Sequence, residues 1–317
     1  ARPSVARLPH DRSDLLFSQG SVTELFQVSI DRWVDVMMAD ERGGGDAVST
    51  VVIARIITKQ DGVLCGIPVV ERLLERHCQA VIADWNFSEG ESISTNNSIV
   101  ELHGDSSEIL RVERTILNII GRMSGIASFT AKWVSKIDGI DIACTRKTEW
   151  GLLDKWAVHI GGGLTHRLDR SDAIMLKEND FAAQQKRDSK DMTNSTYMMV
   201  ENIDLDLNAH FTVIEVGDEK MAIEVAMIWK RRQVDRNGSE RVVLLLDNMG
   251  PELAKDCVKS LERLSLEDWC VVEGSGGIDY ESLQNWSVSG VDLISTSAIN
   301  RGVAPLDLSM LILSEDM

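Results

Sequence analysis

The stretch VVLLLD, residues 242–247, is an apolar run that ends in a carboxylate. Such a run is apolar on both faces, which is typical of a parallel strand covered by helices. Similar runs, each followed by a helical pattern, recur in the second half of the chain: GIDIACTRK (139–147), AIMLK (173–177), HFTVIEV (210–216), CVVEGSGG (270–277) and GVDLISTS (290–297). This repetition predicts an α/β barrel or a doubly wound sheet.

Charged residues stand at the ends of these predicted strands, and the basic ones form a group: Arg146, Lys147, His166, Arg167 and Lys177. Ligands bind at the carboxyl ends of the strands in both architectures, so these side chains are expected to converge. Arginine pairs bidentately with carboxylates or phosphates, which predicts a small ligand with more than one negative group. The alternatives are a structural ion-pair network and polar residues that only mark where buried strands reach solvent.

Two acidic residues, Glu215 and Asp247, end successive predicted strands. Beside phosphates they would contact Mg²⁺ or stabilise positive charge that develops on a sugar ring. A glycosidase with paired carboxylates is the alternative, but the neighbouring cations favour a sugar that carries phosphates.

Glycines cluster at two of the strand ends. The run GGG (161–163) predicts backbone packed closely against other atoms, although a turn with positive φ would explain one or two of these glycines. Ser275, Gly276 and Gly277 follow a strand and are expected to open onto a helix over residues 279–286. That arrangement would aim backbone N–H groups at a phosphate.

Composition limits the class of protein. The chain has 317 residues, with 50 acidic and 33 basic ones and a formal charge of −17, which disfavours nonspecific binding to nucleic acid or to an anionic membrane. No apolar run approaches the roughly 20 residues that span a bilayer, and the first residues lack an apolar signal core, which predicts a cytoplasmic protein. The five cysteines form no Cys-x-x-Cys pair and are expected to be buried free thiols, rather than disulfides or a zinc site.

The first half of the chain has a different pattern. Residues 49–78 predict a strand, a turn at Asp61-Gly62, a second short strand and a helix, and residues 81–103 predict further short strands, as in an α/β sandwich. A long helix over residues 107–136 follows. Its buried stripe consists of Ile109, Val112, Ile116, Ile119, Ile120, Met123 and Ala127, and a polar face carries Arg111, Arg114, Asn118 and Arg122.

A series of motifs then occurs in the order seen in one enzyme family: ADERGGGDAVST (39–50), DGVLCGIPV (61–69), VERTILNIIGRMSGIAS (112–128), TRKT (145–148), AVHIGGGLTHR (157–167), LKEND (176–180), LLLDNMGPE (244–252), EGSGGI (273–278) and SGVDLIS (289–295). With these motifs the chain resembles the quinolinate phosphoribosyltransferases, also called nicotinate-nucleotide pyrophosphorylases (carboxylating), from about residue 35 to 313.

The resemblance implies an α/β fold of the type II phosphoribosyltransferases. An N-terminal α/β sandwich would comprise residues 1–125, with a C-terminal segment of about residues 298–317 packing back on it, and an incomplete, open parallel α/β barrel would comprise residues 126–297. The implied reaction joins quinolinate to phosphoribosyl pyrophosphate in NAD biosynthesis, and gives nicotinate mononucleotide, CO₂ and pyrophosphate. The implied cofactor is Mg²⁺, and the implied assembly is a homodimer. Residues 182–210 and 229–241 are expected to be surface loops or frayed helices.

The same resemblance assigns roles to residues. The quinolinate carboxylates would meet Arg146, His166, Arg167 and Lys177, together with Arg114 from the partner subunit. Phosphoribosyl pyrophosphate would meet Lys147, Glu215, Asp247, Ser275, Gly276, Gly277 and Ser297. Lys147, Glu215 and Asp247 are the implied catalytic residues, and Glu215 and Asp247 the implied Mg²⁺ contacts.

The chain departs from the family pattern at several positions. Glu149 and Trp150 stand in place of Thr-Pro, Asp180 in place of a histidine, Val213 in place of a glutamate, Ser297 in place of a glycine, and Asn300-Arg301 in place of Thr-His. A Cβ at residue 297 would crowd a close approach of the backbone to a phosphate.

Other functions remain open at this point. A nicotinate phosphoribosyltransferase handles a monocarboxylate and would need fewer cations. A related transferase, such as the pyrophosphorylase-like proteins associated with molybdate uptake, would keep the phosphate residues and change the acceptor side. A non-catalytic ligand-binding descendant is favoured only by the departures. Retention of the whole cationic group argues for quinolinate.

Overall fold

The computed structural model describes residues 8–41, 49–188, 192–206 and 210–313. Within these residues the chain divides into two compact units. Unit 1 comprises the described residues within 1–11, 135–146 and 166–296, and unit 2 those within 12–134, 147–165 and 297–317.

Unit 1 is built on a parallel sheet of six strands in the order β8-β13-β12-β11-β10-β9. The strands are β8 (Asp141–Ala143), β9 (Ile174–Leu176), β10 (Thr212–Val216), β11 (Val242–Asp247), β12 (Cys270–Ser275) and β13 (Leu293–Ser295). Each lies within one of the apolar runs, so the predicted α/β class and the parallel sheet are confirmed. The sheet is open, because β8 and β9 are its two edges.

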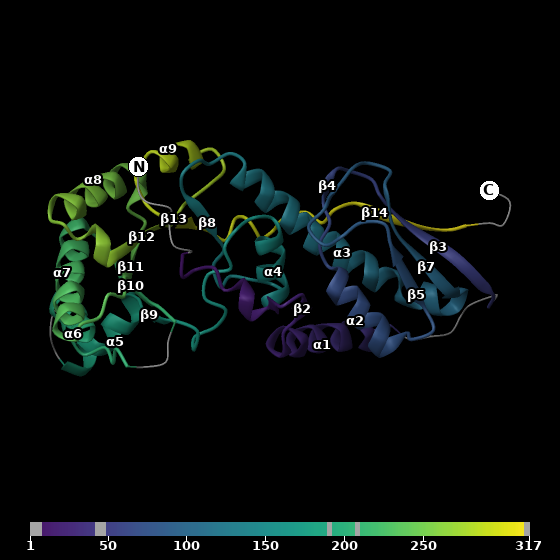
Figure 1. Ribbon diagram of the computed structural model, residues 1–317, viewed down its shortest axis with the longest axis horizontal. Helices are drawn as coiled ribbons and strands as arrows, with labels where there is room; N and C mark the ends of the chain where they lie inside the picture. The colour runs from purple at the N-terminus through teal and green to yellow at the C-terminus, as the bar shows by residue number, and fades with distance from the viewer. Residues whose placement is uncertain (1–7, 42–48, 189–191, 207–209, 314–317) are drawn as a thin grey trace. The chain divides into compact units, whose positions relative to one another are not determined.

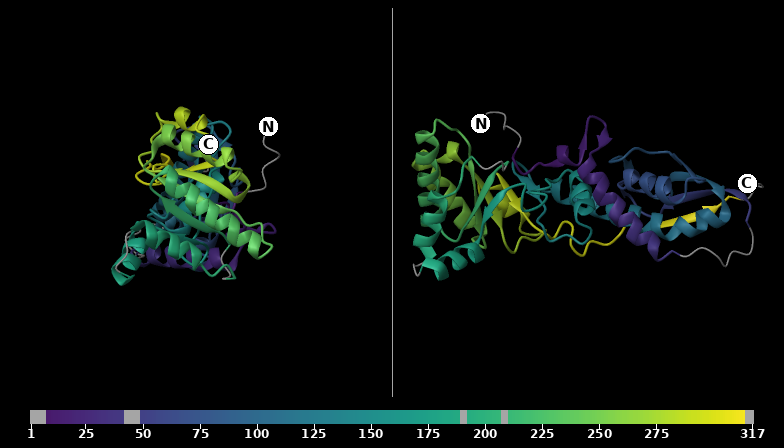
Figure 2. Two further views of the ribbon diagram at one scale, coloured as in Figure 1. Left: turned by 90° about the vertical axis from the view of Figure 1, so that its left-hand side faces the viewer. Right: turned by 90° about the horizontal axis from the view of Figure 1, so that it is seen from below.

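Helices cover this sheet from the outside. They are α5 (Glu178–Asp188), α6 (Met192–Glu201), α7 (Glu219–Asp235), α8 (Gly250–Arg263) and the short α9 (Leu283–Ser287), with a 3₁₀ turn over Glu267–Trp269. Helix α7 contacts β10 and β11, and α8 contacts β12. Figure 1 shows α7 and α8 beside these strands, and the left view of Figure 2 looks onto the helical layer. Covered in this way, the first five residues of β11 are all buried, as the unbroken run VVLLL predicts.

Two stretches expected to be surface loops or frayed helices are largely helical, and the bounds of one predicted helix were wrong. Within residues 182–210, α5 and α6 occupy most of the described chain, and α7 continues through residues 229–235. Of the two alternatives stated for these stretches, the helical one therefore holds for most of their described residues. The helix expected over residues 279–286 begins only at Leu283 and has five residues.

Unit 2 contains an antiparallel sheet of four strands in the order β14-β3-β7-β5. Its strands are β3 (Val51–Thr58), β5 (Ile82–Trp85), β7 (Ser98–Asp105) and β14 (Leu308–Ile312), and two small two-stranded sheets pair β1 (Phe17–Ser18) with β2 (Ser21–Val22) and β4 (Gly62–Val63) with β6 (Ser92–Ile93). The helices of the unit are α1 (Glu24–Ala39), α2 (Ile67–His77), α3 (Ser106–Val134) and α4 (Leu152–Ile160), and Ser13–Leu15 form a 3₁₀ turn. The two predicted strands and the helix over residues 49–78 are confirmed, whereas the bend lies at residues 59–60 and Gly62 already belongs to β4.

Helix α3 is the central helix of unit 2. Every residue of its predicted apolar stripe is buried, and the helix contacts β3, β7 and β14. The predicted domain boundary between residues 125 and 126 falls inside this helix.

Gly161 explains part of the glycine run at residues 161–163, because a Cβ there would collide with the backbone carbonyl of Ala127 in α3. Gly162 has a φ of +89°, which accounts for a second glycine.

Two expectations from composition can be compared with the structure. The five cysteines are all buried free thiols, as predicted. In the described part of the chain, no helix combines the length and the apolar character needed to cross a bilayer.

Candidate active site

Most of the predicted site residues belong to unit 1, and those on its parallel strands lie at the carboxyl ends. His166 and Arg167 were also expected at a strand end, but they lie in the segment between α4 and β9. Arg114, Lys147 and Ser297 belong to unit 2. Arg146 follows β8, Lys177 follows β9, Glu215 lies near the end of β10, Asp247 ends β11 and Ser275 ends β12. Because neighbouring parallel strands end at the same edge, the sheet brings these groups to one side of unit 1.

Arg146, Arg167 and Arg170 form a concentration of positive charge in unit 1. The half-buried position of Arg167, together with repulsion from Arg146 and Arg170, lowers the pKa of its guanidinium. Asp180 and Asp169 offset this repulsion in part. A guanidinium placed among others of like charge is stabilised by an anion, so this group is arranged to accept a negatively charged ligand.

A salt bridge and a hydrogen bond connect the end of β9 to the end of β10. Lys177 Nζ lies 2.7 Å from Glu215 Oε2, and the backbone N–H of Glu178 donates to Glu215 Oε1 at 3.2 Å. For this pair of strand ends, the alternative of an internal ion pair is therefore observed. Asp180, which stands where the family has a histidine, accepts a hydrogen bond from the backbone N–H of Lys177 at 3.0 Å and so fixes the first turn of α5.

The ends of β11 and β12 form the glycine-containing part of the site. Asp247 pairs in register with Ser275, and Asn248, with φ of +55°, donates its backbone N–H to the carbonyl of Ser275 at 2.9 Å. Gly276 has a φ of +91°, and a Cβ there would collide with the Asn248 side chain. Around Gly277, with φ of +61°, a Cβ would meet no atom within 4 Å. Backbone is therefore exposed beside Asp247, as a phosphate loop requires.

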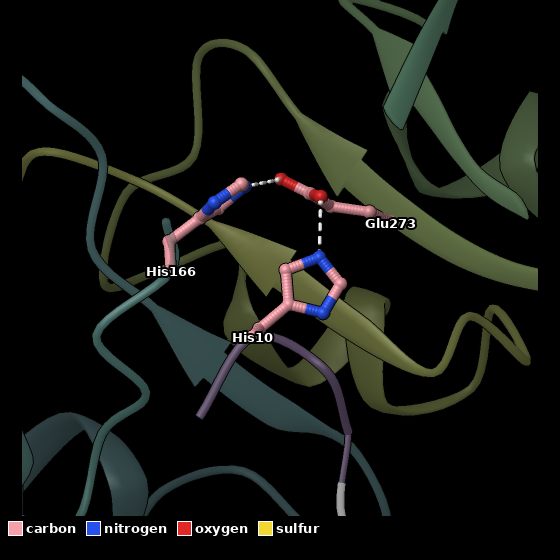
Figure 3. Close-up of side chains that lie close together, drawn as sticks. All are labelled: His10, His166 and Glu273. Carbon is pink, nitrogen blue, oxygen red and sulfur yellow. Dashed lines mark hydrogen bonds and ion pairs between the residues drawn. The ribbon is translucent and has the colours of Figure 1, made fainter. Parts of the chain in front are cut away.

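A buried carboxylate lies deeper on the same strand. A Cβ at Gly274 would collide with the Trp286 ring of α9, so Gly274 faces the helix and its neighbours Glu273 and Ser275 face the opposite side. The Glu273 side chain is 0% exposed, and Figure 3 shows it between two imidazoles. His10 Nε2 lies 3.0 Å from Oε2, and His166 Nε2 lies 3.2 Å from Oε1.

These imidazoles decide the charge of Glu273. Burial by itself would raise the pKa of the carboxyl, but His166 and His10 outweigh burial and hold the pKa well below its ordinary value. Sequence reasoning did not identify His10 or Glu273 as site residues. The available signal was a single acid inside the apolar run CVVEGS, because a buried carboxylate requires partners.

Asn300, one of the departures from the family pattern, binds the backbone of Lys147 within unit 2. The side-chain amide of Asn300, which is 1% exposed, donates to the backbone carbonyl of Lys147 at 2.9 Å. The carbonyl of Ser297 accepts the backbone N–H of Arg301 at 2.8 Å, so Ser297 and Asn300 belong to one tight turn.

Glu149 and Trp150 form a second local network in unit 2. Arg122 donates to both oxygens of the buried Asp154 at 3.0 and 2.9 Å, and to Glu149 at 2.7 Å. Its guanidinium also lies 5.0 Å from the centroid of the Trp150 ring. Of the polar face predicted on α3, Arg122 is therefore structural, whereas Arg114 is exposed.

Comparison with known proteins agrees with this geometry. Residues 44–124 match the family model for the quinolinate phosphoribosyl transferase N-terminal domain, and residues 126–311 match the model for its C-terminal domain. The chain is 34% identical over 275 residues, covering 82% of this chain and 88% of the relative, to a probable nicotinate-nucleotide pyrophosphorylase [carboxylating] of Methanothermobacter thermautotrophicus. It is 31% identical over 268 residues, 83% of this chain and 95% of the relative, to a protein of the same description from Archaeoglobus fulgidus.

A solved structure has the same fold. The nicotinate-nucleotide pyrophosphorylase from Francisella tularensis superposes with a TM-score of 0.76 at 27% identity, covering 90% of this chain and 97% of that chain.

Proposed function

Because the chain belongs to the quinolinate phosphoribosyltransferase family, we propose that it transfers the phosphoribosyl group of phosphoribosyl pyrophosphate to quinolinate, with loss of CO₂, in NAD biosynthesis. The observation that supports this most directly is that Arg146, Lys177, Glu215 and Asp247 lie at the strand ends of unit 1. Arg167, from the segment before β9, interacts with Arg146. A dicarboxylate and a polyphosphate repel each other, and a cationic group between them offsets that repulsion.

The acceptor half of the proposed site consists of Arg146, Arg167 and Lys177. Guanidinium forks bind carboxylates bidentately, so Arg146 and Arg167 suit the two adjacent carboxylates of quinolinate. Lys177 is held by Glu215 at 2.7 Å, and a quinolinate carboxylate would compete for its ammonium group. His166 has a different position from the one expected of a direct ligand, because its side chain is only 6% exposed and donates to Glu273.

The donor half in unit 1 consists of Asp247 and the backbone of residues 275–277, with Glu215 on the neighbouring strand. Lys147, which directly follows Arg146 in the chain, is proposed to bind the pyrophosphate. The pyridine nitrogen forms a bond to C1 of the ribose while the bond from C1 to pyrophosphate breaks, and the leaving pyrophosphate takes the electron pair. Carboxylates beside the ribose stabilise the positive charge that develops on the ring. Lys147 and the exposed N–H groups stabilise the negative charge of the leaving group.

Decarboxylation follows the ribosyl transfer. The nitrogen is then a pyridinium, which stabilises the electron pair left on the ring when the bond to the carboxylate breaks and CO₂ departs. A proton replaces the carboxylate and gives nicotinate mononucleotide. The protein contributes by holding the second carboxylate through its guanidinium partners, so that the ring stays in place.

The carboxylates at the strand ends suit Mg²⁺ unequally. Asp247 is half-buried at the end of β11 and accepts one hydrogen bond from Asn248 at 2.7 Å, which leaves oxygen lone pairs for a cation. Both oxygens of Glu215 already accept hydrogen bonds. Asp247 would therefore be the main protein contact, and Mg²⁺ held by the pyrophosphate would neutralise the charge of that leaving group.

A homodimer completes the proposal. One face of the unit 2 sheet exposes Val51 (84%), Ile53 (38%) and Ile82 (67%), and such an apolar face suits contact with a second copy of the chain. The exposed Arg114 would then act in the partner's site.

The five buried thiols fit a cytoplasmic location, where thiols stay reduced.

Complementation between two inactive variants tests the shared site. Arg114→Ala and Arg146→Ala homodimers should both be inactive. After unfolding and refolding together, the mixed dimer should recover activity, because one of its sites then contains Arg146 from one subunit and Arg114 from the other. Two variants that stay inactive when mixed, but form mixed dimers, would refute a contribution of Arg114 in trans.

The function itself is tested with purified protein, phosphoribosyl pyrophosphate and Mg²⁺, supplied with either quinolinate or nicotinate. Quinolinate should give nicotinate mononucleotide and CO₂ in equal amounts, whereas nicotinate should give no product. Mononucleotide formed from nicotinate alone would refute the assignment of quinolinate, and EDTA should stop the reaction if Mg²⁺ is required.

A further inference from the structure

His10 is a buried histidine of unit 1, far along the chain from the residues that it contacts. It lies 263 residues from Glu273 in sequence, and its side chain is 0% exposed. We propose that His10 is a positioning residue for the acceptor half of the site: through Glu273 it fixes the tautomer and orientation of His166, and through His166 it fixes the backbone that carries Arg167. The inference depends on the proposed role of Arg167 toward quinolinate.

The hydrogen bonds of His166 define its tautomer. The backbone N–H of Arg167 donates to His166 Nδ1 at 2.7 Å, so Nδ1 carries a lone pair. The remaining ring nitrogen, Nε2, therefore carries the proton and donates it to Glu273 Oε1 at 3.2 Å. One imidazole thus connects the buried carboxylate directly to the backbone of Arg167.

The backbone of His166 requires this support. Its φ is +53°, a conformation that a residue with a Cβ rarely adopts and that surrounding contacts must maintain. The side chain is held on both of its polar sides, by Glu273 and by the Arg167 N–H. Loss of the Glu273 contact would let the ring rotate and would release the turn from which the Arg167 side chain extends.

His10 in turn keeps Glu273 in place. It donates to the second carboxylate oxygen at 3.0 Å, so each oxygen of the buried group has one imidazole partner (Figure 3). The His10 ring packs edge-on against His166, with centroids 4.8 Å apart, and lies 5.2 Å from the Phe211 ring. A turn in which the Asp11 N–H donates to the Leu8 carbonyl at 3.1 Å presents His10 to this slot.

A metal ion is the competing interpretation of these side chains. Their possible ligand atoms all lie within 4.8 Å of one another, and two histidines with a glutamate are a donor set used for zinc. Binding through His166 Nε2 would require a lone pair on that nitrogen. The Arg167 N–H already uses the lone pair of Nδ1, so a neutral ring has none left for a metal. The geometry therefore favours the hydrogen-bonded chain.

Two substitutions at His10 distinguish the effect of its hydrogen-bond donor from the effect of its ring packing. In His10→Gln the side-chain amide can place an N–H close to the position of Nε2, whereas His10→Phe keeps an aromatic ring and removes the donor. His10→Phe should raise the KM for quinolinate about tenfold, the effect of losing one hydrogen bond to a charged group. Its KM for phosphoribosyl pyrophosphate should change by less than about threefold, because the donor end of β12 is held by its pairing with β11 and by the Asn248 N–H, which do not involve His10. His10→Gln should keep both KM values close to those of the wild type.

Two kinetic results would overturn the proposal. One is a folded His10→Phe protein whose KM for quinolinate equals that of the wild type. The other is equal impairment of the Gln and Phe variants, which would show that ring packing rather than the donor matters. If wild-type protein makes no product from quinolinate, the proposed function fails, and the kinetic comparison at His10 does not apply.

A spectroscopic measurement on the wild type does not depend on activity. Long-range ¹H–¹⁵N spectra of histidine-labelled protein report the tautomer of each imidazole, and His166→Gln identifies the signal of His166. We expect the Nε2–H tautomer. An Nδ1–H tautomer, or one equivalent of zinc that stays bound and is lost in His10→Phe, would refute the hydrogen-bonded chain.

Discussion

Lys177 Nζ lies 2.7 Å from Glu215 Oε2, so the cation that ends β9 is paired with the carboxylate that ends β10. The Lys177 side chain is 44% exposed and that of Glu215 is 15% exposed. An ion pair this accessible contributes at most about 1 kcal/mol to stability. Its importance lies in function, because it joins the acceptor and donor halves of the proposed site.

The first prediction concerns Lys177. Lys177→Met should lower kcat/KM for quinolinate by about 100-fold, because it removes a charge from the acceptor half, and should change the free energy of unfolding by less than about 1 kcal/mol. Lys220→Met is the matched control, since Lys220 is 80% exposed and pairs with Glu224 on α7. Steady-state kinetics and urea unfolding check both variants. Equal kinetics for the two would remove Lys177 from the site.

The second prediction compares Arg146 and Arg170, whose positive charges both lower the pKa of Arg167. Arg146→Ala should abolish turnover, a loss of at least about 1,000-fold, because a bidentate carboxylate partner disappears. Arg170→Ala removes the same charge from a residue that is proposed to contact neither substrate, and should reduce kcat/KM by less than about fivefold. Release of ¹⁴CO₂ from labelled quinolinate measures both. Near-normal release by Arg146→Ala would exclude its proposed role.

The third prediction uses the neighbouring glycines after β12. Gly276→Ala should lower the free energy of unfolding by about 2 kcal/mol or more, because φ is +91° and the new Cβ would collide with Asn248. Gly277→Ala meets no atom within 4 Å, so it should cost only about 1 kcal/mol for its φ of +61°. Urea unfolding measures the difference, and identical losses would contradict the role of Asn248. Both variants should raise the KM for phosphoribosyl pyrophosphate, since both place a Cβ where backbone is proposed to approach phosphate.

The fourth prediction concerns Arg122, which binds both oxygens of Asp154. The Asp154 side chain is 0% exposed, so Arg122→Ala would leave a buried charge without its guanidinium partner and should lower stability by about 3 kcal/mol. The double variant Arg122→Leu with Asp154→Leu should be more stable than Arg122→Ala. Thermal unfolding checks both, and an Arg122→Ala protein as stable as the wild type would contradict the account of this network.

The fifth prediction follows from the lowered pKa of Glu273. A carboxyl whose pKa is lower in the folded state stabilises the fold fully above its unfolded pKa of about 4.3, and this contribution is lost as the pH falls through the folded value. Wild-type stability should therefore fall more steeply than that of Glu273→Gln below about pH 4.3, by up to about 1.4 kcal/mol per pH unit. Urea unfolding at a series of pH values measures both slopes. Parallel slopes would show that Glu273 is not ionised in the fold.

Local patterns in the sequence were sufficient for the strands of unit 1 and for the buried stripe of α3. An apolar run such as residues 242–246 becomes a buried strand wherever parallel neighbours cover it, and the spacing of residues 109–127 defines one face of a helix. The carboxyl ends of parallel strands meet at one edge, so the sequence by itself also brought Arg146, Lys177, Glu215 and Asp247 to the same side of unit 1.

Only the tertiary structure decided which of these groups pair and which side chains support them. His10 reaches Glu273 across 263 residues, His166 adopts a positive φ that no pattern in the sequence predicts, and Lys177 pairs with Glu215 on the next strand. The physical reason is that periodicity records how each segment meets the core, whereas a hydrogen bond between distant segments depends on the path of the whole chain. The partners of a buried charge therefore become known only when the segments that carry them are placed together in space.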